Sequence, residues 1–133
     1  MATKSQTFLT DIHTHSTFSL DGISPLADML ESAQKMGVAF YGVSEHFDYD
    51  LEPDKQDEDF HLIDDKAYFH TARHLQEDYE GVMNVLIGVE FGYTPEKNAH
   101  TRYAFIVEKY RPDFIVNSIH TCQGVDYYSQ KPF

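Results

Sequence analysis

The stretch that decides the fold is Thr7-Phe8-Leu9-Thr10-Asp11-Ile12-His13-Thr14-His15, in which a short apolar run leads into two histidines two positions apart. Side chains alternate along a β-strand with a period of two, so a strand over Thr7–Ile12 directs His13 and His15 to the same face. Two neutral imidazoles on one face form a chelate for a divalent metal. The sequence therefore predicts a strand that ends in a metal-binding pair, and other elements must supply further ligands.

Short apolar runs alternate with longer amphipathic runs along the rest of the chain, which is the pattern of βα units. The strand-like runs are Thr7–Ile12, Val38–Val43, Asn84–Glu90 and Phe114–Ile119. The helical runs are Pro25–Met36, Asp65–Glu80 and Asn98–Tyr110. Strands in this order predict parallel pairing with right-handed crossovers, and therefore an α/β fold.

The helical runs also predict which side chains enter the core. The first helix has Ser24 as its expected N-cap, Pro25 at its first position and Gly37 as its stop. Its expected core face consists of Leu26, Met29, Leu30, Ala33 and Met36. The corresponding faces of the later helices consist of Ala67, Tyr68, Ala72, Leu75 and Tyr79, and of Tyr103, Ile106, Val107 and Tyr110.

Length and composition favour a single globular domain over residues 1–133, with 41% hydrophobic residues and no linker or internal repeat. The formal net charge of −12 disfavours binding to a nucleic-acid backbone. Part of the acidity lies in Asp48–Asp59, which we interpret as a solvated loop rather than a guide for metal or substrate.

The sequence favours a protein of the cytoplasm. Its single cysteine, Cys122, excludes an intramolecular disulfide and fits a reducing compartment. The stretch Met1–Gln6 is polar and lacks the apolar core of a signal peptide. No segment approaches the roughly 20 apolar residues that span a bilayer, so no membrane association is expected.

Each predicted strand ends in side chains able to bind a metal. The carboxyl ends of parallel strands gather at one edge of a sheet, so these side chains should converge there. They are His13, His15, His46, Glu90 and His120, with Ser44, Glu45 and Ser118 beside them. Glu90 follows the apolar run Val85–Val89, and a carboxylate buried at that point needs a cation or a strong partner. Such a carboxylate can also bridge two metals.

Other candidates have competing interpretations. Asp21 precedes Gly22, and this spacing alone favours a turn over a metal ligand. Glu45 is expected to orient a neighbouring imidazole rather than bind metal itself. His70 and His74 share a helix face, and we expect them to be solvated.

The motifs His13-Thr14-His15-Ser16, Ser44-Glu45-His46-Phe47-Asp48, Gly88-Val89-Glu90 and Ser118-Ile119-His120 resemble those of the polymerase and histidinol phosphatase (PHP) family. The stretches His15–Gly22 and Asn117–His120 are most similar to the histidinol-phosphate phosphatase branch. Glu45 departs from the family pattern, in which Asp usually precedes the histidine of the second motif. The family's later motifs, a further histidine and a closing Asp-x-His, have no counterpart in the sequence.

This resemblance implies a distorted (βα)7 barrel with three divalent metals, of which the chain supplies the amino-terminal part, truncated after about four strands. It implies that His13 and His15 hold one metal and that Glu90 bridges it to a second metal bound by His120. It also implies that Asp21 and His46 hold the third metal. Zinc, manganese and iron all suit such ligands. The implied reaction is hydrolysis of L-histidinol phosphate in histidine biosynthesis, with a metal-activated hydroxide as nucleophile.

Two alternatives remain open. One is another PHP phosphoesterase or an exonuclease domain, which the acidic charge disfavours. The other is an inactive metal-binding half-barrel that forms homo-oligomers through its exposed sheet edge.

Overall fold

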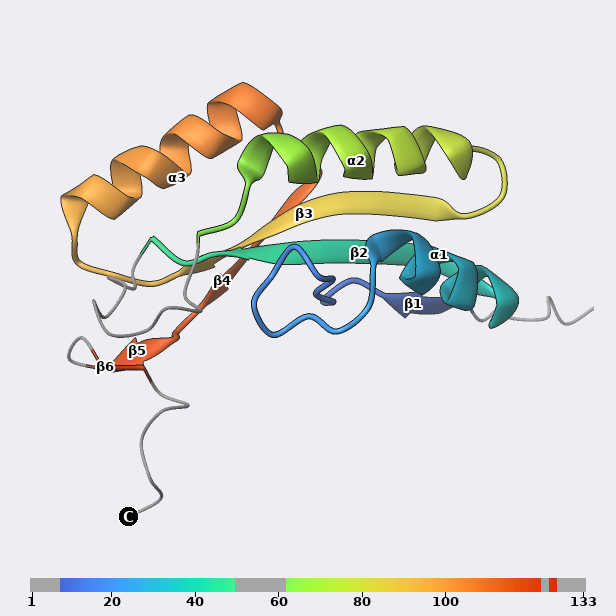
Figure 1. Cartoon of the computed structure of the whole chain (residues 1–133), viewed down its shortest axis with the longest axis horizontal. Coiled ribbons are helices and arrows are strands. Elements are labelled where there is room, and N and C mark those ends of the chain that lie inside the picture. Colours follow the sequence, from blue (N-terminus) through green and yellow to red (C-terminus); the bar gives the residue numbers. More distant parts are fainter. Residues whose placement is uncertain (1–7, 50–61, 123–124, 127–133) are drawn as a thin grey trace, which may run out of the picture.

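The fold is an α/β arrangement of parallel strands and helices, seen in a computed structural model that describes residues 8–49, 62–122 and 125–126 (Figure 1). The main sheet has the strand order β1-β2-β3-β4, and all three pairings are parallel. The elements in chain order are β1 (Leu9–Asp11), α1 (Leu26–Lys35), β2 (Val38–Phe47), α2 (Asp65–Asp78), β3 (Asn84–Gly92), α3 (Lys97–Tyr110), β4 (Phe114–Ser118), β5 (Thr121–Cys122) and β6 (Val125–Asp126). The predicted fold class is confirmed, as a curled part-barrel.

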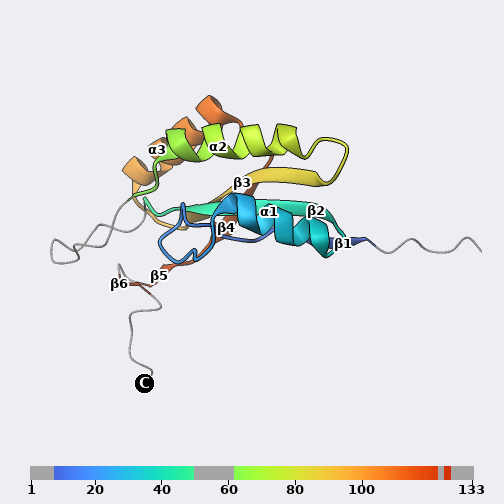
Figure 2. The ribbon, with the colours of Figure 1, turned by 45° about the vertical axis from the view of Figure 1, so that its right-hand side comes forward.

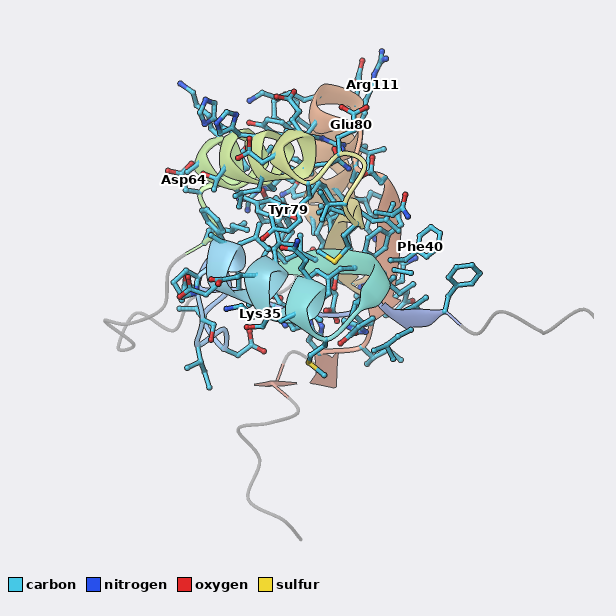
Figure 3. All side chains as sticks on the ribbon, turned by 90° about the vertical axis from the view of Figure 1, so that its right-hand side faces the viewer. Lys35, Phe40, Asp64, Tyr79, Glu80 and Arg111 are labelled. Carbon is cyan, nitrogen blue, oxygen red and sulfur yellow. The ribbon has the colours of Figure 1, made fainter. Side chains whose placement is uncertain are left out.

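One face of the sheet packs on the helices and forms the core. Helices α2 and α3 lie over this face in both views, with α1 beside β1 and β2 (Figures 1 and 2). Figure 3 shows the side chains gathered between the sheet and α2, which runs from Asp64 at its N-cap to Tyr79 at its C-cap. The fully buried Tyr68 of α2 donates its hydroxyl to the Gly88 carbonyl at 2.6 Å, tying the helix to β3.

Alternation along β2 and β3 separates a helix-facing side from a polar side. The core contains Tyr41, Val43, Phe47, Val85, Ile87, Val89 and Phe91 from these strands. Residues at the intervening positions, including His46 and Glu90, belong to the opposite face. Burial of each large apolar side chain contributes about 1.5–3 kcal/mol, so this pattern fixes the strand register.

Two glycines on the polar face leave room for an aromatic ring from β4. A Cβ added at Gly88 would lie 2.4 Å from the ring of Phe114, and one at Gly42 would lie 3.0 Å from it. The ring therefore lies against bare backbone where side chains would otherwise stand.

The first helix departs from the predicted cap and core face. Helix α1 begins at Leu26, and Pro25 is its N-cap with no side-chain hydrogen bond, so Ser24 does not cap it. Leu26, Leu30 and Ala33 are buried as predicted. The prediction that Met36 belongs to the core is wrong, because its side chain is 72% exposed.

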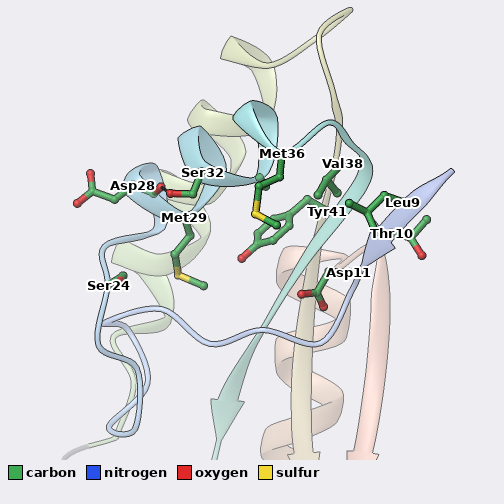
Figure 4. Close-up of a pocket in the computed structure, with 11 residues that line it drawn as sticks. Leu9, Thr10, Asp11, Ser24, Asp28, Met29, Ser32, Met36, Val38 and Tyr41 are labelled. Carbon is green, nitrogen blue, oxygen red and sulfur yellow. Dashed lines mark hydrogen bonds between the residues drawn. The ribbon is translucent and has the colours of Figure 1, made fainter.

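Met36 lies instead beside an open groove of about 460 Å³ between α1 and β1 (Figure 4). Its apolar lining comes from Leu9, Met29, Ala33, Met36, Val38 and Tyr41. None of the predicted metal ligands lines this groove.

The strands differ from prediction mainly in length. Strand β2 continues to Phe47 and β3 to Gly92, because Ser44–Phe47 pairs with Gly88–Phe91. His46 and Glu90 are direct register partners inside the sheet, rather than residues that follow it. Strand β1 is shorter than predicted, and the acidic stretch lies outside the described residues from position 50 to position 59.

The helix–core predictions for the later helices are largely confirmed. Tyr68 and Ala72 of α2 and Tyr103 and Ile106 of α3 are buried, while the other predicted apolar side chains are only partly buried. Phe69 of α2 was missed and is also buried. At the end of α3, Arg111 adopts φ 48° and its side chain projects outward (Figure 3).

Candidate metal centre

Glu90 is the centre of a cluster of imidazoles at the carboxyl ends of the strands. It lies near the end of β3 and is only 3% exposed. The Nε2 atoms of His13 and His15 lie 2.8 and 3.3 Å from its Oε2. On the other side, the Nε2 atom of His120 lies 3.0 Å from its Oε1. One buried carboxylate therefore contacts imidazoles from both ends of the described chain.

These contacts keep the Glu90 carboxylate negatively charged. Burial by itself raises the pKa of the carboxyl group, since it penalises the charged form. Contacts with His120, Ser118 and His13 outweigh this effect and hold the pKa well below its usual range. Glu90 is therefore negatively charged near neutral pH.

The segment after β1 keeps its histidines beside β2. The Thr14 hydroxyl donates to the Gly42 carbonyl at 2.9 Å, and the Ser44 N–H donates to the Thr14 carbonyl at 2.9 Å. The rings of His13 and His15 are 5.3 Å apart, and both reach the same carboxylate oxygen. The structure thus brings the two histidines together as their spacing predicts.

A second contact within the cluster joins His46 and Asp21. The His46 Nε2 atom lies 3.4 Å from Asp21 Oδ2, and the His46 ring stacks on His15 at 4.2 Å. Burial lowers the pKa of His46, but the carboxylates of Asp48, Glu90 and Asp21 outweigh burial and raise it. The pKa of His15 is lowered by burial and by the neighbouring His46.

The loop that carries Asp21 is held by a buried carboxylate. Glu45, which is fully buried, accepts hydrogen bonds from the Ser16 N–H at 2.9 Å and from the hydroxyls of Ser16 and Ser19. Burial raises the pKa of Glu45. The loop also needs a glycine at position 22, because a Cβ there would lie 1.7 Å from the Ser16 carbonyl oxygen. Glu45 therefore fixes the loop rather than contacting an imidazole ring directly.

Sequence reasoning missed Asp48 as a member of the site. Its Oδ1 atom lies 3.2 Å from His120 Nδ1 and 3.5 Å from His46 Nδ1. Burial raises its pKa, yet the contacts with His120 and His46 outweigh burial and lower it to about 2. The available signal was its spacing of two from His46, which places both side chains on one side of an extended segment.

The donor set fits divalent metal ions. Three groups have ligand atoms within 4.8 Å of one another: His13, His15 and Glu90; His15, Asp21 and His46; and His46, Glu90 and His120. All six candidate ligands occur in these groups. Among the described residues, the buried Nδ1 atom of His15 also lacks a hydrogen-bond partner. Mixed nitrogen and oxygen ligands suit zinc, manganese and iron.

Other histidines of the described chain lie outside these groups. His70 and His74 are exposed on α2, and His74 Nδ1 is 4.0 Å from Glu77. His100 Nε2 lies 2.6 Å from the Thr94 carbonyl oxygen. The side chain of Cys122 lies outside the described part.

The chain belongs to the PHP domain family, whose domain it matches over residues 11–132. It is 29% identical over 120 residues to a protein named probable histidinol-phosphatase from Schizosaccharomyces pombe, with coverage of 85% of this chain and 39% of the relative. It is 28% identical over 120 residues to a protein of the same name from Clostridium acetobutylicum, with coverage of 90% and 42%.

Solved structures show the same fold. The histidinol phosphate phosphatase of Lactococcus lactis subsp. lactis Il1403, crystallised with zinc, L-histidinol and phosphate, matches with a TM-score of 0.73 and 23% identity, covering 89% of this chain and 42% of that one. A putative histidinol phosphatase from Listeria monocytogenes gives 0.67 and 24%, covering 84% and 44%. The chain thus spans about two fifths of the length of these relatives. Within the described residues, no helix has the length and apolar character needed to cross a membrane.

Proposed function

We propose that these residues form the metal-binding part of a phosphomonoesterase site, with L-histidinol phosphate as substrate and L-histidinol and phosphate as products. The observation that carries the proposal is the buried Glu90 carboxylate between His13 and His15 on one side and His120 on the other. The names of the relatives and the ligands of the Lactococcus lactis structure support the choice of substrate.

The residues divide among three proposed metal positions. His13, His15 and Glu90 would hold one metal, and Glu90 with His120 a second. Asp21 and His46 would hold a third, next to the first because the His15 and His46 rings stack. When bound, divalent metals supply Lewis acidity that activates water and neutralises charge on the phosphoryl group.

The remaining residues of the site hold these ligands in place. Glu45 fixes the loop that carries Asp21 through Ser16 and Ser19. The Thr14 hydroxyl, bonded to Gly42, keeps the preceding histidine beside the sheet. Such preorganisation lets the ligands meet a metal without rearrangement of the backbone.

Local positive charge matters for this substrate, because the chain has a formal net charge of −12. A phosphate monoester is itself anionic and is repelled at long range. Bound divalent cations invert the local charge and let an acidic protein bind an anionic ester.

The test combines metal content with two substrates. The purified chain is loaded with zinc or manganese, and release of phosphate from L-histidinol phosphate is compared with cleavage of single-stranded DNA. We expect bound metal and phosphate release that both fall in Glu90→Gln. The matched control Glu31→Gln removes an exposed carboxylate of α1 and should change neither.

Two outcomes would overturn the proposal. Cleavage of DNA without phosphate release would favour an exonuclease. Bound metal without turnover of either substrate would favour a metal-binding module. The predicted cytoplasmic location, single domain and association through the sheet edge stay predictions.

A further inference from the structure

Asp48 lies immediately after β2 and contacts two imidazoles from opposite parts of the chain. Its Oδ1 atom is 3.2 Å from His120 Nδ1 and 3.5 Å from His46 Nδ1. The side chains of Asp48, His46 and His120 are only 18%, 18% and 13% exposed. The carboxylate is therefore held between the two rings with little access to solvent.

The same two rings face different carboxylates through their other nitrogens. His120 Nε2 lies 3.0 Å from Glu90 Oε1, whereas His46 Nε2 lies 3.4 Å from Asp21 Oδ2. A carboxylate next to Nδ1 favours the tautomer with its proton on Nδ1, which leaves the Nε2 lone pair free for a metal. Asp48 thus contacts two proposed ligands on the side of each ring that faces away from its metal. The two rings point to two separate metal positions.

We propose that Asp48 is a shared positioning residue, which fixes the ring orientation and tautomer of both His46 and His120 and so prepares two metal positions at once. This inference rests on the proposed metal site. It assigns Asp48 an outer role, because its Oδ1 atom faces the Nδ1 atoms of both rings and not the Nε2 atoms that face Asp21 and Glu90.

A single carboxylate behind two ligands has a specific consequence. Loss of Asp48 should weaken two metal positions together and leave the position held by His13 and His15 intact. Removal of a carboxylate partner of a metal-bound histidine typically weakens metal binding about 10- to 100-fold.

The test follows zinc binding by calorimetry and imidazole nitrogens by two-bond proton–nitrogen NMR. In zinc-loaded wild type, His46 and His120 should coordinate through Nε2 and retain a proton on Nδ1. In Asp48→Ala, two zinc positions should weaken about 10- to 100-fold, and the Nδ1 protons of both rings should exchange faster with solvent. Asp48→Asn retains one acceptor oxygen and should weaken binding less. Asp28→Ala, an exposed acid of α1, is the matched control and should match wild type.

Each contrary result is decisive. Unchanged zinc affinity and tautomers in Asp48→Ala would overturn the proposal, as would coordination through Nδ1 in the wild type. If the wild type binds no zinc, the proposed function fails instead. In metal-free protein at about pH 9, where imidazoles are neutral, Asp48→Ala should shift both rings toward the Nε2–H tautomer relative to wild type, and no shift would overturn the role of Asp48.

Discussion

The Nε2 atom of His13 lies 2.8 Å from the Oε2 atom of Glu90, although the residues are 77 positions apart in the chain. The contact exists because β1 and β3 flank β2 in a parallel sheet, so their carboxyl ends meet. His120 reaches the same carboxylate from the segment after β4. A single buried acid therefore contacts imidazoles that lie far apart in the sequence.

Removal of the negative charge at this position should abolish tight metal binding. Glu90→Gln keeps the shape of the side chain but loses the anionic ligand. Since loss of even an outer partner weakens binding about 10- to 100-fold, we expect a loss greater than about 100-fold. Calorimetric titration with zinc measures it. Wild-type affinity in Glu90→Gln would refute the role of Glu90.

The glycine beneath the Phe114 ring should tolerate no side chain. A Cβ at position 88 would lie 2.4 Å from that ring, so Gly88→Ala should lower the free energy of unfolding by about 1–3 kcal/mol. Urea denaturation followed by circular dichroism checks this. In a Phe114→Leu background, the same substitution should cost less than about 1 kcal/mol. Equal costs in both backgrounds would show that the ring is not the cause.

Asp113 should make the stability of the protein depend on pH in the acid range. Burial raises its pKa, but hydrogen bonds from the Ile87 N–H, Arg73 and Gln76 outweigh burial and lower it. Because the folded pKa lies below the unfolded value, the stabilisation is present above the unfolded pKa. It is lost as pH falls through the folded pKa.

Unfolding free energies at pH values from neutral to acid measure this effect. Asp113→Asn should cost about 1–3 kcal/mol at neutral pH and flatten part of the acid dependence. Asp78→Asn, at the exposed end of α2, serves as control. The same acid dependence in Asp113→Asn and wild type would contradict the assignment.

Glu45 should be required for a folded loop over residues 16–22. Glu45→Ala removes the acceptor of three hydrogen bonds and leaves a cavity, so we expect a loss of about 2–5 kcal/mol in unfolding free energy. Glu45→Gln preserves volume and an acceptor oxygen and should cost less. Thermal denaturation ranks the two variants, and a larger loss in Glu45→Gln would argue against this role.

Much of the fold follows from local patterns. The alternation of apolar runs predicts parallel βα units, and the position of Glu90 after an apolar run predicts the carboxylate on which the histidines converge. Strand lengths were less predictable. His46 belongs to β2 only because it pairs with Glu90 across the sheet, and such pairing is a tertiary contact that no local pattern contains.

The residues that support the site could not be predicted from the sequence pattern either. Asp48 begins a run of acidic residues, so the sequence predicts a solvated side chain. Only the folded structure shows that Asp48 contacts His120. Ser16 and Ser19 acquire a role only when the loop folds over Glu45. Met36 fits the helical period but lies where α1 overhangs an open groove.

The most direct test of the central claim is anomalous diffraction at the zinc edge from crystals of the chain grown with zinc. We predict an anomalous peak about 2.0–2.2 Å from Glu90 and from ring nitrogens of His13 and His15. Zinc bound only at other positions, such as the exposed His70 and His74, with no peak beside Glu90, would contradict the account.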